Sequence, residues 1–127
     1  EADSTPFSCV DEQTLRCTRQ ELRQLMWRSV SLSRDQEGLL TAQRQVRALR
    51  AQLTHAHVEA QPRLVETLNM LLVADLVIAA ALERRESRGS HWRQDYQSTN
   101  VDLAGHRFVF LSPHAARCAQ KEVAVHA

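Results

Sequence analysis

The sequence contains few residues that break helices or make turns. Only three glycines and three prolines occur among 127 residues, whereas a domain of many short strands needs turn residues between them. This scarcity argues against an all-β fold and favours long, uninterrupted helices. A chain of this length fits one domain with a modest hydrophobic core.

An excess of charge of one sign is also missing. Sixteen basic and 15 acidic residues leave a net charge of +1, which gives no reason to expect nucleic acid or an anionic membrane as a partner. The cysteines, Cys9, Cys17 and Cys118, are odd in number and form no CxxC pair, so a secreted disulfide framework is disfavoured and we expect a cytoplasmic protein. The start has no signal-peptide pattern and no initiator Met, which indicates a piece of a longer protein.

Motifs that bind nucleotides or catalytic metals are absent from the sequence. It contains no GxGxxG, GxxxxGK[ST] or HExxH, and Gly38, Gly89 and Gly105 are too far apart to cradle a phosphate. His55 and His57 are two residues apart, so a helix would point them to different faces. We therefore expect no catalytic, cofactor-binding or metal-binding residue in this chain.

Apolar periodicity predicts three helices. Thr18 and Glu21 fit a capping box for a first helix that runs to Leu32, Asp35 can cap a second, and Pro62 suits the first position of a third. The apolar positions of the first two helices are Leu22, Leu25, Met26, Val30, Leu39, Ala42, Val46, Leu49 and Leu53. We predict an all-α fold: a three-helix up-down-up bundle over 14–97, a linker over 1–13 and an extended tail over 98–127. Residues 106–111 could pair as a strand or pack as part of that tail.

The third helix, expected over 62–86, is apolar nearly all round. Its run over 70–82 is interrupted only by Asp75, which should meet a basic partner because an unpaired buried carboxylate is costly. The run is shorter than the ~20 residues of a membrane helix, so we expect a buried helix and no membrane. Two neighbouring helices would not cover it fully. We expect self-association through helix 62–86 or contact with another domain.

A dense charged segment follows this helix. Cations near a helix C-terminus complement its dipole, and Gly89 could supply the left-handed residue that closes the helix. This interpretation leaves His91, Arg93 and Asp95 unexplained. Since a guanidinium presents a rigid fork to carboxylates and carbonyls, Arg88 and Arg93 could clamp another domain.

Two segments resemble a known family. Residues 85–96, RESRGSHWRQDY, resemble the R-x-E-S-R-G-x-H-x-R-x-D-Y-P signature of the succinate dehydrogenase and fumarate reductase flavoprotein superfamily, allowing for Glu86 directly after Arg85. Residues 22–35, LRQLMWRSVSLSRD, resemble the L-R-x-x-M-W-x-x-V-G-I-x-R segment of its L-aspartate oxidase branch. The pair Met26 and Trp27 favours that branch. The sequence departs from the patterns at Ser31, in place of glycine, and at Gln97, in place of proline.

The resemblance, over residues 18–97, implies a non-catalytic C-terminal helical domain that docks on the flavin-binding and capping domains of a parent enzyme. That enzyme would use FAD, bound outside this chain, to oxidise L-aspartate to iminoaspartate in NAD biosynthesis, while this fragment alone would be inactive. The residues that carry over with a presumed docking role are Arg34, Glu86, Ser87, Arg88, Gly89, His91, Arg93 and Asp95. The alternatives are a succinate dehydrogenase or fumarate reductase flavoprotein subunit, and a free-standing helical interaction module.

Overall fold

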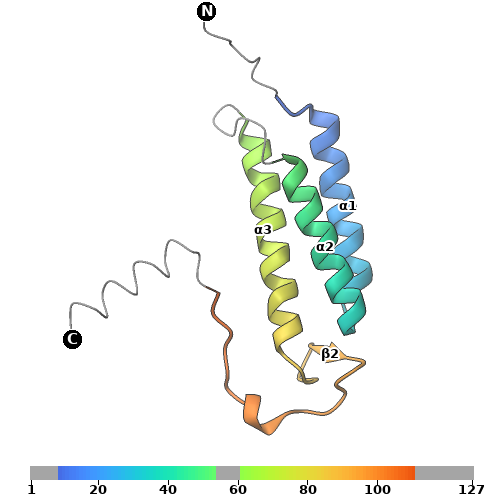
Figure 1. The fold of residues 1–127 in the computed structure, drawn as a ribbon, viewed down its shortest axis with the longest axis vertical. Coiled ribbons are helices and arrows are strands. Elements are labelled where there is room, and N and C mark those ends of the chain that lie inside the picture. The colour runs from blue at the N-terminus through green and yellow to red at the C-terminus, as the bar shows by residue number, and fades with distance from the viewer. Residues whose placement is uncertain (1–8, 54–60, 111–127) are drawn as a thin grey trace, which may run out of the picture.

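Three long helices dominate the structure, a computed structural model that describes residues 9–53 and 61–110. The helices α1 (Glu12–Val30), α2 (Gln36–Leu53) and α3 (Pro62–Glu83) lie side by side and alternate in direction (Figure 1). The predicted all-α bundle is confirmed. At its lower end in this view, the chain leaves α3 and crosses beneath the helices.

The core lies where the apolar periodicity places it. Each helix turns one stripe inward, because positions three and four residues apart share a helix face. Of the positions predicted for α1 and α2, only Met26 is partly rather than fully buried. The buried apolar side chains are Leu15, Leu22, Leu25, Val30, Leu39, Ala42, Val46, Leu49, Leu53, Leu64, Leu71, Ala74, Ile78 and Ala81.

The helix α1 begins earlier than predicted. Asp11 caps it by accepting hydrogen bonds from the backbone N–H of Thr14 at 2.8 Å and from the Thr14 hydroxyl at 2.6 Å. The predicted start at Thr18 is wrong, since the Thr18 hydroxyl donates to the carbonyl of Thr14 inside the helix. The helix also ends at Val30, before the predicted Leu32.

The helix α3 starts at Pro62, as predicted, but ends at Glu83 rather than at residue 86. Asp75 has the expected polar partners: Arg47 Nε lies 3.2 Å from its carboxylate, and Gln43 Nε2 donates to it at 3.0 Å. By length and composition alone α3 could cross a membrane, since it has 22 residues and an 18-residue stretch of it has a mean hydropathy of 1.9. The expected absence of a membrane stays a prediction, because the run over 70–82 on which it rested is only part of this helix. Its inward stripe is buried in the bundle, whereas only 33% of that apolar stretch is buried in total.

A short parallel pairing joins two distant segments at the lower end. Strand β1 (Ser33–Arg34) pairs with β2 (Trp92–Arg93), so that Arg34 lies opposite Arg93. A 3₁₀ helix, η2 (Val101–Leu103), follows. Residues 106–110 are extended without strand pairing, which agrees with the tail alternative. The rest of the predicted tail, from 111 on, lies outside the described residues.

Candidate functional site

The signature segment gathers at the end of the bundle where α1 and α3 finish and α2 begins. Arg34 Nε donates to the carbonyl of Val30 at 2.8 Å, at the C-terminus of α1. Arg93 Nη1 donates to the carbonyl of Ala81 at 2.6 Å, near the C-terminus of α3. A guanidinium suits these positions because the last carbonyls of a helix lack partners and carry partial negative charge. The pairing of β1 with β2 thus sets two arginines on two helix ends.

Two carboxylates occupy the N-terminus of α2. Asp35 Oδ1 accepts from the backbone N–H of Gly38 at 2.8 Å, which confirms the predicted cap. Asp95 Oδ2 accepts from the N–H of Gln36 at 3.1 Å. Asp95 also receives both prongs of Arg93, at 2.8 Å from Nε and 2.6 Å from Nη2. The hydrogen bonds from Arg93 hold the pKa of Asp95 below its usual value. One ion pair therefore links the ends of α2 and α3.

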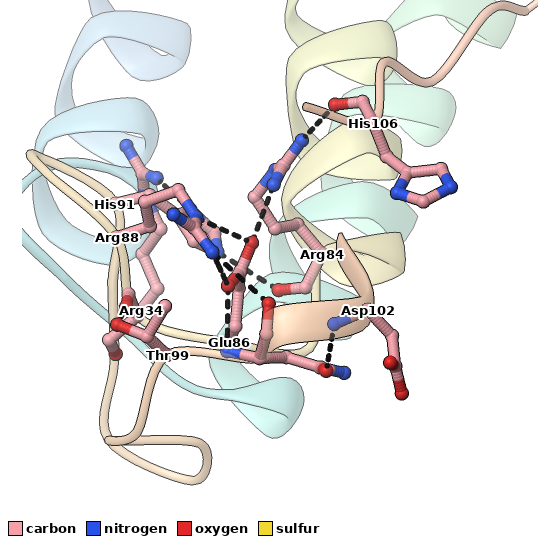
Figure 2. A network of polar contacts seen from close by, with 10 residues as sticks. Arg34, Arg84, Glu86, Arg88, His91, Thr99, Asp102 and His106 are labelled. Carbon is pink, nitrogen blue, oxygen red and sulfur yellow. Dashed lines mark hydrogen bonds and ion pairs between the residues drawn. The ribbon is translucent and has the colours of Figure 1, made fainter. Parts of the chain in front are cut away.

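Glu86 is the centre of a second network, drawn in Figure 2. Its side chain is fully buried. Arg84 Nη1 donates to Oε1 at 2.6 Å, Arg88 Nε lies 3.2 Å from both oxygens, and the N–H of Asn100 donates to Oε2 at 2.8 Å. These donors, Arg88 foremost, lower the pKa of Glu86 to about 2. The carboxylate is ionised at neutral pH and ties the end of α3 to the segment around residue 100.

His91 bridges the loops after α1 and α3. Its Nδ1 lies 2.6 Å from Nη1 of Arg34, and its Nε2 lies 3.0 Å from the carbonyl of Arg84. A guanidinium only donates and a carbonyl only accepts, so Nδ1 is the acceptor and Nε2 carries the proton. Burial first, and then the nearby arginines, lower the pKa of His91. The ring is therefore a neutral connector.

Ser87 and Gly89 shape the tight turn that carries His91. Backbone hydrogen bonds of 2.8 and 3.0 Å join Arg88 and His91 in both directions, and Gly89 adopts the left-handed φ of 58° at the first central position. Gly89 thus closes this turn rather than α3, contrary to the prediction, because Arg93 and His91 already satisfy carbonyls at the end of that helix. The buried Ser87 hydroxyl accepts from the N–H of Arg93 at 2.8 Å.

Sequence reasoning missed the anchoring of the tail. Arg84 Nη2 donates to the carbonyl of His106 at 2.6 Å, and the Arg84 guanidinium lies 5.2 Å from the ring centroid of Phe108. Arg88 Nη2 donates to the carbonyl of Asn100 at 3.1 Å. Most of these contacts use backbone groups of the later segment, so no residue type there signals them.

All eight predicted site residues lie together at this end of the bundle. Arg93 is 1% exposed, and its guanidinium donates to the Asp95 carboxylate and to the carbonyl of Ala81, both in its own chain. Arg88 is more exposed but pairs with Glu86. Within 9–53 and 61–110, no group of three metal-ligating side chains could hold an ion; His55 and His57 lie outside these ranges. The arrangement caps helices and fixes loops, and among the described residues it contains no nucleophile paired with a base.

Comparisons with known proteins agree on one family. The family described as the fumarate reductase flavoprotein C-terminus matches residues 19–125. An L-aspartate oxidase of Pseudomonas aeruginosa is 40% identical over 78 residues, which are 60% of this chain and 14% of that protein. A polypeptide of the fumarate reductase (CoM/CoB) of Methanothermobacter marburgensis is 38% identical over 91 residues, covering 66% of this chain and 17% of that polypeptide.

A solved structure has the same arrangement. A chain of the Mycobacterium smegmatis Sdh1 complex in the apo form superposes with a TM-score of 0.60 and 28% identity, over 81% of this chain and 18% of that one. The chain thus spans less than a fifth of the length of each of these relatives.

Proposed function

Because this chain belongs to the fumarate reductase flavoprotein C-terminal family, we propose that it is the C-terminal helical domain of an FAD-dependent L-aspartate oxidase. In this proposal the domain is non-catalytic and docks on the flavin-binding and capping domains of the parent. The observation that carries the choice is the 40% identity to the Pseudomonas aeruginosa L-aspartate oxidase. The pair Met26 and Trp27, quoted above for that branch, supports it.

The described residues do not fit a flavin dinucleotide. Such a cofactor needs closely spaced glycines at the start of a helix, where backbone N–H groups face the pyrophosphate. Gly38 lies inside α2, with the Asp35 carboxylate 3.4 Å from where a Cβ would stand, and Gly89 and Gly105 lie in separate loops. We therefore assign FAD to the part of the parent that this chain does not cover.

In the parent enzyme, L-aspartate would be oxidised to iminoaspartate, with FAD as the hydride acceptor, as a step of NAD biosynthesis. The contribution of this domain is structural: its ion pairs fix the loops at one end of the bundle and give the docking domains a rigid surface. We place the enzyme in the cytoplasm, which the free, exposed thiols of Cys9 and Cys17 support.

A flavoprotein subunit of a fumarate reductase or succinate dehydrogenase is the second candidate. The match to the Methanothermobacter marburgensis polypeptide, at 38% identity, and the similarity to the Sdh1 complex favour it. Both candidates use the same helical domain, so the fold does not separate them. The substrate does.

The test is to express the full-length parent protein and to record its visible spectrum and its oxidation of two substrates. A yellow protein that produces peroxide with L-aspartate and does not oxidise succinate would support the oxidase. Succinate oxidation or fumarate reduction without aspartate turnover would assign the chain to a respiratory flavoprotein. A colourless full-length protein would refute both.

A further inference from the structure

One side of the bundle, between α1 and α3, is a groove with apolar walls. A hollow of about 480 Å³ lies beside Met26, Trp27, Met70 and Val73. A second hollow of about 350 Å³ lies next to His91 and Phe108, and Val77 lines both hollows. Some of the lining belongs to the bundle itself, since Met26 and Met70 pack against the core. Trp27, Val73 and Val77 are not part of the buried core, so folding of the bundle alone gives no reason for these three side chains to be apolar.

The exposure of these side chains is high. Trp27 is 75% exposed, Val73 58% and Val77 43%. A contiguous apolar surface of this kind marks an interaction site rather than a solvated face. An exposed tryptophan at its rim is the residue type most often found at the energetic centre of interfaces.

The charges around the groove have one sign. Arg23 lines the first hollow, and Arg34 and Arg84 line the second. Arg84 shares the Glu86 carboxylate with Arg88, and within the described ranges neither Arg23 nor Arg34 pairs with a carboxylate. No Asp or Glu of the described chain lines either hollow. The surface is therefore complementary to an apolar segment with acidic residues toward its two ends.

We propose that this α1–α3 groove is where the rest of the parent chain docks, through an apolar segment that carries carboxylates facing Arg23 and Arg34. The identity of the occupant depends on the proposed function. The relatives support it, because more than four fifths of each relative's own chain lies outside the region that matches this domain and is available to dock on it. Arg34, one of the residues carried over from the family, then contacts the docked segment directly, and Arg84 lines the same end of the groove.

A second copy of this chain is a poorer occupant. Two such faces would bring Arg23 and Arg34 of both copies into one interface without a carboxylate from either groove. Like charges placed together in this way weaken association. Self-association through α3, expected from the sequence, is therefore a competing outcome of the test.

The experiment measures cysteine labelling in the full-length parent protein. Val77→Cys reports on the groove, and Leu40→Cys on α2 is a matched control, because the two positions are 43% and 42% exposed in this domain. Each variant is treated with a maleimide under native conditions, and labelling at that position is followed by peptide mass spectrometry and normalised to the denatured protein. Val73→Cys provides a second groove position if Val77→Cys does not fold.

We expect Cys at position 77 to react at least ~10-fold more slowly than Cys at position 40, at every protein concentration, because reaction then requires undocking. Equal rates would overturn the proposal. Slow labelling that appears only as concentration rises would also overturn it, by assigning the groove to a second copy. Adding Arg23→Glu should accelerate labelling at 77, whereas Arg50→Glu on the exposed face of α2 should not.

This readout is independent of catalysis. A protein that protects position 77 but fails to oxidise L-aspartate would refute the enzyme assignment and leave the docking surface standing. A working oxidase with equal labelling at both positions would do the reverse.

Discussion

Replacing Arg93 by Met should destabilise the bundle more than any other change in the signature. Arg93 is 1% exposed, and the variant would leave both the carbonyl of Ala81 and the Asp95 carboxylate without their guanidinium partner. Removing one partner of a buried ion pair costs about 3 to 5 kcal/mol. Because Asp95 is 28% exposed and can hydrogen-bond to water, we expect the free energy of unfolding to fall by about 3 kcal/mol, the smallest value in this range.

The assay is urea unfolding followed by far-UV circular dichroism. A loss of this size should lower the urea concentration at the unfolding midpoint by about 1 to 2 M, given the m-values usual for small proteins. Arg50→Met, at an exposed position of α2, should change stability by less than ~0.5 kcal/mol and serves as the control. A cycle with Asp95→Asn should give a coupling of about 1 to 3 kcal/mol with Arg93.

The reasoning would be refuted if Arg93→Met and Arg50→Met unfolded at the same urea concentration. A zero coupling between Arg93 and Asp95 would show instead that the ion pair is incidental and that the loss arises from the helix end alone.

Three further results are expected. The pKa of Glu86, lowered from 4.5 to about 2, means that its stabilisation is complete above pH 4.5 and is lost as the pH falls toward 2; Glu86→Gln should flatten the fall in urea midpoint over this range and lower the midpoint at pH 7. Gly89→Ala should cost about 1 kcal/mol in urea unfolding, because φ is 58° although a Cβ meets nothing within 4 Å. Asp75→Asn should cost no more than ~1 kcal/mol by the same assay, because its partner Arg47 is 61% exposed.

Each of these three predictions would be contradicted by a particular result. An unchanged acid dependence in Glu86→Gln would remove Glu86 as the source of the pH effect. Gly38→Ala, inside α2, should stabilise by up to ~1 kcal/mol. If Gly38→Ala and Gly89→Ala changed the free energy of unfolding by the same amount, the positive φ of Gly89 would not be the cause of the loss expected for Gly89→Ala. A loss of about 3 kcal/mol or more for Asp75→Asn would place that ion pair in the core.

The helices were predictable because their signals are local. The stripe of Leu39, Val46 and Leu53 repeats within one segment, and Pro62 and Asp35 mark starts through their own backbone chemistry. The errors arose at the ends. Asp11 caps α1 ahead of the Thr18 pattern, and α3 ends before Glu86 because distant side chains satisfy its last carbonyls. Local sequence patterns do not show which distant side chains will meet the carbonyls at a helix end.

The sequence by itself determined the all-α class, the inward stripes, the surplus of apolar surface on the third helix and the family signature. Only the tertiary structure decided what the signature does: it sets Arg34 and Arg93 on two helix ends, makes His91 a neutral bridge, and buries Glu86 among arginines. The physical reason is the separation along the sequence of the residues that interact. Helical periodicity arises between residues three or four apart, whereas these contacts join residues such as Arg34 and His91, which are 57 positions apart in the chain.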